Sequence, residues 1–400
     1  MPRIMLAPDL HCYYANYGKV GPDGVHSRLA EWKEIAESLV DAADRASVDV
    51  AVFPGDYFPN PRPSAAQIME VARLFRALED AGITVIGCAG NHDVGASNQP
   101  GPVDLLATMG GPDGLWGITQ PRTVTVAGID FAVLPFMRSA AVSANAEDTT
   151  DAADTMSRSL LAIAQALRAQ STSKTKVLVG HWTLVGAQTS SGQIMAGSGE
   201  PAMSYAELAG MGFDAILMGH IHKPQVLSNA PFTAYAGALQ RCDFGEERDP
   251  RGCWVWGSET REHGWIDLPA RRFYTIDLRG DAAVQSWIER PDLAEDEATS
   301  VRDAIVRVRY RCSLDVALKV DTRDVRRKLL AAEPHHIAGI NSDIIRGERA
   351  RDASVTEATQ PVEALQKYLA QRGDVVPERA EAVQRAAEGI IAELEKGVSA

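Results

Sequence analysis

The sequence predicts a layered α/β domain in which helices cover β-sheet, followed by a smaller α+β unit and two C-terminal helices. Over the first 220 residues, short apolar runs alternate with longer amphipathic segments, as in proteins whose helices pack on a sheet. An acidic stretch at 289–300, which contains Pro291, interrupts this pattern. A chain of 400 residues is long enough for two or three folding units.

The first domain is expected to span 1–288. Apolar runs of strand length lie at 3–7, 48–53, 83–89, 176–179 and 215–218, and 124–135 is typical of a hairpin. Apolar residues at helical spacing predict helices over 27–47, 64–81 and 151–169. Ser27 is the expected N-cap of the first helix, and Gly82 the expected stop of the second. Short runs at 225–228, 232–235, 253–256 and 273–277 are expected to complete this domain.

The second domain is expected at 289–351, with strands at 304–312 and 336–345 and a helix at 322–332. In the first of these strands Arg307, Arg309 and Arg311 alternate with apolar residues, so the three arginines share one face. They are candidate contacts for DNA phosphates, or a solvated face paired with Asp and Glu. The tail, 352–400, contains helix candidates at 362–371 and 377–396.

Composition is that of an ordinary globular protein, with 45% hydrophobic and 23% charged residues. No apolar run approaches the ~20 residues of a membrane helix, and no secretory signal is evident, so we expect a cytoplasmic protein. The net charge of −13 is unusual for a DNA-binding protein. Residues 301–351, however, hold 12 Lys and Arg against 7 Asp and Glu, and this basic segment is a candidate for phosphate contact.

The five cysteines show no disulfide framework, and reduced thiols are expected. Cys242 and Cys253, with His263 nearby, are the alternative of a zinc site. No CxxC motif accompanies them, which disfavours that alternative.

Five short motifs combine Asp, Asn or His with the end of an apolar run. They are Asp9-Leu10-His11, Gly55-Asp56, Gly90-Asn91-His92-Asp93, Gly180-His181 and Gly219-His220-Ile221-His222. Ligand sites in open α/β sheets lie beyond the carboxyl ends of the strands, where these motifs are expected. Each motif alone is also explained by a turn or a capped loop. The ordered set instead predicts a metal site.

The residue types indicate two divalent cations. Carboxylate, amide oxygen and imidazole favour Mn, Fe or Zn, and Mg is a further possibility. Two such cations at a common site can bind a phosphate and activate water, which predicts hydrolysis of phosphate esters.

The ordered set resembles that of the calcineurin-like metallophosphoesterases over residues 1–222. The resemblance implies a four-layer sandwich of two mixed β-sheets flanked by helices. It implies that Asp9, His11, Asp56 and His222 hold one metal. It implies that Asp56, Asn91, His181 and His220 hold the other, with Mn the expected ion. His92 would protonate the leaving oxygen, and Asp93 would orient His92.

A second stretch of the sequence resembles a narrower group of proteins within this family. Residues 235–247, followed by Arg251-Gly252, are similar to the "Y-x-G-S … F-x-E … K-G" region of SbcD-type nucleases. That resemblance implies a DNA exonuclease and endonuclease of repair and recombination. It also implies a DNA-capping second domain, a tail that binds an SbcC-type coiled-coil ATPase, and a homodimer within a heterotetramer. The chain departs from the pattern at Pro8, Pro59 and Ala238.

Two other functions compete with the nuclease. A small-molecule phosphodiesterase or phosphatase of the same superfamily would explain the acidic first 300 residues, but not the additions after them. A catalytically dead scaffold that only docks an ATPase conflicts with the intact ligand set. His335 and His336 are either extra ligands or exposed loop residues. An apolar stripe from Val383 to Leu394 either binds the partner's coiled coil or packs on the second domain.

Overall fold

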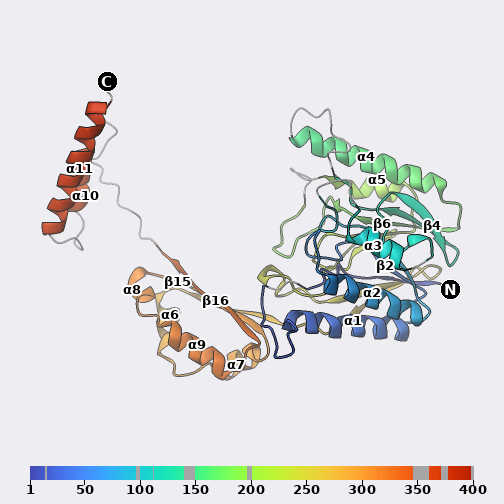
Figure 1. Ribbon diagram of the computed structural model, residues 1–400, viewed down its shortest axis with the longest axis horizontal. Coiled ribbons are helices and arrows are strands. Elements are labelled where there is room, and N and C mark those ends of the chain that lie inside the picture. Colours follow the sequence, from blue (N-terminus) through green and yellow to red (C-terminus); the bar gives the residue numbers. More distant parts are fainter. Residues whose placement is uncertain are drawn as a thin grey trace.

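A computed structural model describes residues 1–13, 16–95, 100–110, 112–138, 149–195, 201–345, 360–370 and 377–397. Its largest part contains two β-sheets packed face to face (Figure 1). The five-stranded sheet has the order β13 (His263–Asp267), β12 (Gly252–Gly257), β1 (Arg3–Leu6), β2 (Val50–Phe53) and β3 (Thr84–Gly87). The six-stranded sheet has the order β10 (Gln225–Asn229), β11 (Phe232–Tyr235), β9 (Ala215–Gly219), β6 (Thr175–His181), β5 (Ile129–Leu134) and β4 (Arg122–Val126).

Helices cover the outer face of each sheet, which confirms the four-layer architecture. α1 (Ser27–Arg45) and α2 (Ala65–Asp80) lie on the five-stranded sheet, whereas α4 (Thr149–Gln170) and α5 (Tyr205–Gly210) lie on the six-stranded sheet (Figure 1). In β1, Ile4 and Leu6 pack between the sheets, and Met5 packs towards the helices. Both faces of this strand are buried, which explains its uninterrupted apolar run.

Local sequence explains where the first helices begin. α2 has Ser64 as its N-cap, in a capping box with Gln67. The predicted N-cap of α1 was one residue late, because the side chain of His26 accepts the hydrogen bond from the Arg28 amide. The Ser27 hydroxyl instead accepts a hydrogen bond from the Lys19 amide.

Several short elements were not predicted. They are α3 (Pro102–Met109), β7 (Thr183–Leu184), β8 (Ala202–Met203), α5, β13, α6 (Asp281–Glu289), α7 (Glu295–Val301) and α8 (Leu314–Ala317), with 3-10 turns at Pro112–Gly114 and Phe244–Glu246. They are too short for a periodic pattern to stand out, and β13 pairs with β12 as a half-exposed sheet edge.

The second unit is a three-stranded parallel sheet in the order β14 (Phe273–Arg279), β15 (Ile305–Cys312) and β16 (His336–Ile344). The prediction that 273–277 completes the first domain is therefore wrong, because β14 pairs with β15 over its whole length. The unit also contains α6, α7 (Glu295–Val301), α8 (Leu314–Ala317) and α9 (Thr322–Ala331). Val306, Val308 and Tyr310 pack with these helices, so the alternating arginines of β15 face the opposite side.

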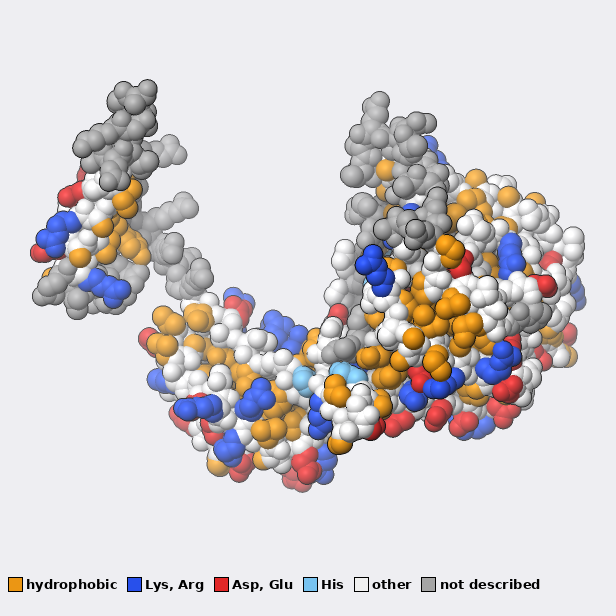
Figure 2. Space-filling model, viewed as in Figure 1, with side chains coloured by type: hydrophobic (Ala, Val, Ile, Leu, Met, Phe, Trp, Pro, Cys, Tyr) orange, Lys and Arg blue, Asp and Glu red, His pale blue; other side chains and the backbone are white. Residues whose placement is uncertain are grey.

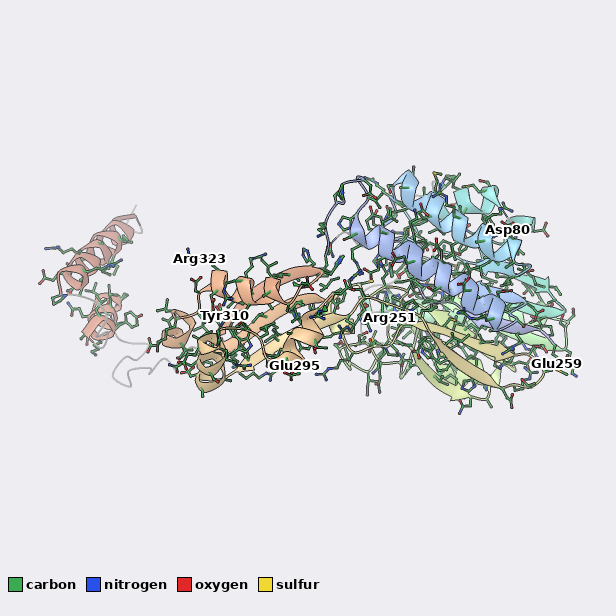
Figure 3. All side chains as sticks on the ribbon, turned by 90° about the horizontal axis from the view of Figure 1, so that it is seen from below. Asp80, Arg251, Glu259, Glu295, Tyr310 and Arg323 are labelled. Carbon is green, nitrogen blue, oxygen red and sulfur yellow. The ribbon has the colours of Figure 1, made fainter. Side chains whose placement is uncertain are left out.

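Two C-terminal helices, α10 (Pro361–Ala370) and α11 (Pro377–Gly397), lie beside each other and apart from the second unit (Figures 1 and 3). Figure 3 also places Arg251 near the junction of the first and second units. None of the described helices is long and apolar enough to cross a membrane.

Candidate metal centre

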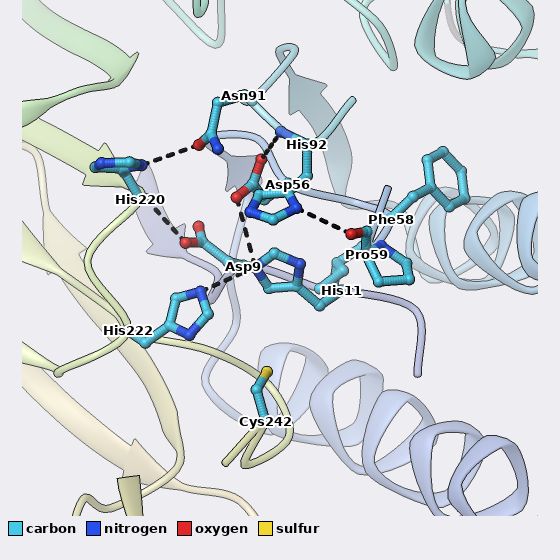
Figure 4. A network of polar contacts seen from close by, with 12 residues as sticks. Asp9, His11, Asp56, Phe58, Pro59, Asn91, His92, His220, His222 and Cys242 are labelled. Carbon is cyan, nitrogen blue, oxygen red and sulfur yellow. Dashed lines mark hydrogen bonds and ion pairs between the residues drawn. The ribbon is translucent and has the colours of Figure 1, made fainter. Parts of the chain in front are cut away.

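The strand order brings the five motifs to one edge of the sandwich. β1, β2 and β3 are parallel neighbours in one sheet, and β6 and β9 are parallel neighbours in the other. Asp9, Asp56 and Asn91 follow the first three strands, His181 ends β6, and His220 follows β9. Figure 4 shows Asp9, Asp56, Asn91 and His220 pointing toward one another, and His181 Nε2 lies 3.3 Å from Asp56 Oδ2.

Tight backbone turns place the ligands. His11, Asp56 and His220 have φ values of 35°, 51° and 94°, which L-residues rarely adopt. A Cβ at Gly55 would lie 2.6 Å from His181 Nδ1, and one at Gly219 would lie 2.6 Å from Asp9 Oδ1. Glycine before the ligand is therefore required by the close approach of the two sheets.

One half of the cluster joins four residues. His11 Nε2 lies 2.9 Å from His222 Nε2 and 3.5 Å from Asp56 Oδ2. Asp9 Oδ2 accepts a hydrogen bond of 2.8 Å from the His220 amide. Asp9 Oδ1 is buried and has no hydrogen-bond partner within the described part of the chain. A buried carboxylate oxygen beside ring nitrogens suits a cation.

The other half shares Asp56. Asn91 Oδ1 lies 3.0 Å from His181 Nε2 and 2.9 Å from His220 Nδ1. His181 Nε2 also lies 3.3 Å from Asp56 Oδ2. Asp56 thus lies between the two halves, in the position of a bridging carboxylate.

Hydrogen bonds on the far side of two rings set their tautomers. His181 Nδ1 donates to the Pro54 carbonyl at 2.8 Å, and His222 Nδ1 donates to Glu246 Oε1 at 2.7 Å. In the neutral rings, Nε2 then carries the lone pair and faces the cluster. Both rings thus present a lone pair toward the cluster, where it could bind a cation.

Glu246 is a functional residue that the sequence reasoning missed as an individual residue. Its carboxylate also accepts hydrogen bonds from Arg251 Nη2 at 2.6 Å and from the Cys242 amide at 2.9 Å. The available signal was the similarity of Phe244-Gly245-Glu246 to the F-x-E part of the SbcD-type stretch. Glu246 orients His222 from behind, as carboxylates behind metal-binding histidines do.

The buried carboxylates of the cluster are stabilised by nearby positive charge. Burial raises the pKa of Asp9 to about 7. Burial also opposes ionisation of Asp56, but His181 and His11 hold the pKa of that carboxyl well below its usual range. Burial lowers the pKa values of His11 and His220 to about 3. Burial also disfavours protonation of His181, but Asp56 outweighs it and raises the pKa of His181 to about 9. His181 thus supplies positive charge to the metal-free cluster, a role that divalent cations would take over when bound.

His92 and Asp93 have separate surroundings. The His92 amide donates to Asp56 Oδ1, and its ring Nδ1 donates to the Pro59 carbonyl, both at 2.9 Å. The Asp93 carboxylate accepts hydrogen bonds from the amides of Gly90, Tyr57 and Phe58. The resemblance implied that Asp93 orients His92. The Pro59 carbonyl does so here, and Asp93 fixes the loop that leads to Pro59.

The remaining candidates lie away from the cluster. Arg307 lies over the Phe244 ring at 4.2 Å and donates to Thr275 Oγ1, so it belongs to the junction of the two units. Arg309 is exposed, and Arg311 lies 3.6 Å from Asp343. His335 Nε2 lies 3.2 Å from Ser27 Oγ, also at the junction.

The proposed alternative zinc site is not formed. His263 stacks on Phe232 with ring centroids 4.5 Å apart, whereas Cys253 is fully buried in the core cluster beneath the helices. All five cysteines are free thiols, as expected.

A cavity of about 300 Å³ opens beside the metal cluster. His220, His222 and Glu246 line this cavity together with Thr189, Ser190 and Ser191. The cluster is therefore reachable from solvent along this side.

The comparisons with known proteins agree with this geometry. A family model described as calcineurin-like phosphoesterase matches residues 2–224. The chain belongs to the calcineurin-like phosphoesterase family. The match covers all five motifs, from Asp9 to His222.

Relatives with known names are distant. Exonuclease subunit 1 of Enterobacteria phage T4 is 27% identical over 53% of this chain and 54% of that protein. The DNA double-strand break repair protein Mre11 of Aeropyrum pernix is 24% identical over 73% of this chain and 61% of that protein. A subunit of the nuclease SbcCD of Staphylococcus epidermidis is 23% identical over 58% of this chain and 62% of that protein. The chain thus spans less than two thirds of each of these relatives.

Proposed function

We propose that this phosphoesterase is a metal-dependent DNA nuclease, with exonuclease and endonuclease activity, that works in repair or recombination with an SbcC-type coiled-coil ATPase. The observation that carries the proposal is the convergence of six candidate ligand side chains around a seventh, Asp56, with His92 beside them. The three relatives described above, two named as nuclease subunits and one as a DNA repair protein, support DNA as the substrate.

The donor set fits two cations. Asp9, His11, Asp56 and His222 would hold the first. Asp56, Asn91, His181 and His220 would hold the second. Oxygen and imidazole donors fit Mn, with Fe, Zn and Mg as the alternatives. When bound, the two cations supply an activated water and charge stabilisation for a displacement at phosphorus.

His92 is the proposed proton donor. Its Nδ1 is engaged with the Pro59 carbonyl, so the second ring nitrogen, Nε2, remains to face the substrate. In the imidazolium form, Nε2–H can pass its proton to the leaving oxygen as the P–O bond breaks. The backbone of His92 is fixed by Asp56 Oδ1, which keeps the ring next to the cluster.

Substitution His92→Ala tests this role on linear duplex DNA with Mn. We expect degradation to fall by about 10²- to 10⁴-fold while Mn binding is retained, because only proton transfer is removed. Gel analysis of the DNA and Mn titration of the same samples measure the two quantities. Undiminished degradation would contradict the assignment of His92.

Two of the three predicted arginines remain candidates for DNA contact. Arg309 and Arg311 are exposed on the face of β15 that turns away from the helices. Arg307 is held between Phe244 and Thr275, so its proposed role is to position this face rather than to bind phosphate. On the side seen in Figure 2, Lys and Arg of the second unit are interspersed with Asp, Glu and apolar side chains. Two or three local phosphate contacts fit this surface better than a broad basic patch.

Exposed apolar side chains on α2 and α3 support the proposed homodimer. Met69, Leu105 and Met109 are 50%, 47% and 44% exposed. Burying them against a second copy would remove apolar surface from water on both chains.

A small-molecule phosphodiesterase is the second candidate. The net charge of −13 and the hydroxyl-lined cavity of about 300 Å³ beside His220 favour a small substrate. Turnover of bis-p-nitrophenyl phosphate by a chain that leaves duplex DNA intact, with and without the ATPase, would support this candidate over the nuclease.

A further inference from the structure

Cys242 lies beside the metal cluster but is not one of the proposed ligands. Its thiol sulfur, a ring nitrogen of His222 and a carboxylate oxygen of Glu246 all lie within 4.8 Å of one another. Figure 4 shows Cys242 on the opposite side of His222 from Asp9. His222 therefore stands between two groups of potential ligands, with Nε2 toward His11 and Nδ1 toward Glu246.

The second group differs in chemistry from the first. The proposed catalytic cluster contains oxygen and imidazole donors, whereas this group adds a thiol. A thiolate, an imidazole and a carboxylate are ligands for Zn²⁺, and sulfur favours Cd²⁺ still more strongly over Mn²⁺. A thiolate would supply one full negative charge to the cation, and the carboxylate a second that it shares with Arg251.

The surrounding contacts hold these three ligands in place. Glu246 Oε2 accepts hydrogen bonds from the Cys242 amide and from Arg251, while Oε1 faces His222. Arg251 can therefore keep its partner while Oε1 binds a cation. His222 and Glu246 also line the cavity of about 300 Å³, which provides an entrance from solvent and room for water as a fourth ligand.

We propose that His222, Cys242 and Glu246 form a separate site for a thiophilic divalent cation such as Zn²⁺ or Cd²⁺, and that this cation competes with the catalytic metal for His222. A neutral imidazole has one lone pair. A cation bound at Nδ1 moves the ring proton to Nε2, which faces His11 and can then no longer bind a metal. The Cys242 thiol loses its proton to solvent as sulfur binds the cation.

The site itself is tested without any activity measurement. Cd²⁺ is titrated into the metal-free full-length protein, and the ultraviolet charge-transfer absorption of the Cd–thiolate bond is recorded. We expect a band that saturates at one Cd²⁺ per chain. The band should be lost in Cys242→Ala and retained in Cys312→Ala, which removes a buried thiol of the second unit. A band that persists in Cys242→Ala would overturn the site.

The competition rests on the proposed function and has its own measurement. Mn-dependent hydrolysis of bis-p-nitrophenyl phosphate is followed at increasing Cd²⁺, and each variant is compared with itself without Cd²⁺. Cys242→Ala should raise the half-inhibiting Cd²⁺ concentration by about tenfold or more, and Cys312→Ala should leave it unchanged. Equal inhibition of wild type and Cys242→Ala would overturn the competition. A chain without hydrolytic activity would refute the proposed function, while the absorption band would still decide the site.

Discussion

Glu246 controls the orientation of His222 from outside the ligand set. We expect Glu246→Gln to weaken Mn binding by about 10- to 100-fold, because the neutral amide still accepts a hydrogen bond but no longer raises the basicity of the ring. Isothermal titration of the metal-free protein with Mn measures the change. The exposed Glu259→Gln is the matched control, since it removes the same charge far from the cluster. Equal Mn affinity of the two variants would refute the role of Glu246.

For individual residues, the sequence predicted a cluster of candidate ligands but not the residues that orient them. Asp9, Asp56 and His181 were identifiable because each comes at or just after the end of a buried strand. Glu246 lies in a short 3-10 turn after a loop, and its contact with His222 spans 24 residues. No periodic pattern encodes such a contact. The sequence also did not reveal that the Pro59 carbonyl, rather than Asp93, accepts the hydrogen bond from the His92 ring. That arrangement depends on the directions in which backbone carbonyls and amides point.

Among the secondary-structure elements, Asp130 ties β5 to the turn between α4 and β6. Its carboxylate accepts hydrogen bonds of 2.6 Å and 2.7 Å from the amides of Thr172 and Ser173. It also accepts bonds of 2.8 Å and 2.7 Å from the hydroxyls of Ser173 and Thr125. Burial opposes ionisation, but these donors together lower the pKa of Asp130 to about 2.

We expect Asp130→Asn to lower the free energy of unfolding by about 1–2 kcal/mol at pH 7, because an amide cannot accept all four bonds. The folded-state pKa lies below the unfolded value of about 3.9, so this stabilisation is present above pH ~4 and is lost as pH falls toward 2. Urea unfolding at pH 7 and pH 3 measures both effects, with the exposed Asp41→Asn as control. A difference between wild type and Asp130→Asn that does not shrink at pH 3 would contradict the ionic origin.

The elements themselves were predictable where they are long or buried on both faces. Apolar residues recur at helical spacing along α1, α2 and α4. The central parallel strands, such as β2, are continuous apolar runs. β14 was found as a strand but placed in the wrong sheet. Its sequence is that of a partly buried strand, with Phe273 and Ile276 buried and Asp277 and Arg279 exposed, and only the pairing with β15 decides which sheet it joins.

On the scale of the whole molecule, a chain of charged side chains links the two units. Glu31 on α1 pairs with the buried Arg28 at 2.7 Å and with Arg271 at 3.0 Å. Arg271 in turn donates to the carbonyl of Asp303 in the second unit at 2.8 Å. Arg28 also reaches the carbonyl of Arg241, next to Cys242. The position of the second unit is thus connected to the loop behind His222, although these contacts join residues too distant in sequence to be predicted.

The C-terminal helices are the proposed binding surface for the ATPase partner. Val383 and Ile390 on α11 are 41% and 60% exposed, so the second unit leaves this described part of the apolar stripe uncovered. An exposed apolar stripe on a helix suits a helix-in-groove contact with a coiled coil. Truncation after Arg351, which lies outside the described residues, should abolish capture of the SbcC-type ATPase in a pull-down, while Mn-dependent hydrolysis of bis-p-nitrophenyl phosphate continues.

Two single substitutions on α11 sharpen this test. Ile390→Lys introduces a charge into the stripe, and Glu381→Lys introduces the same side chain at an exposed position on the opposite side of the helix. We expect the first to weaken ATPase binding by at least about tenfold, since it buries an unpaired charge, and the second to have little effect. Surface plasmon resonance with immobilised ATPase gives both affinities. If the two variants bind alike, the stripe is not the docking surface.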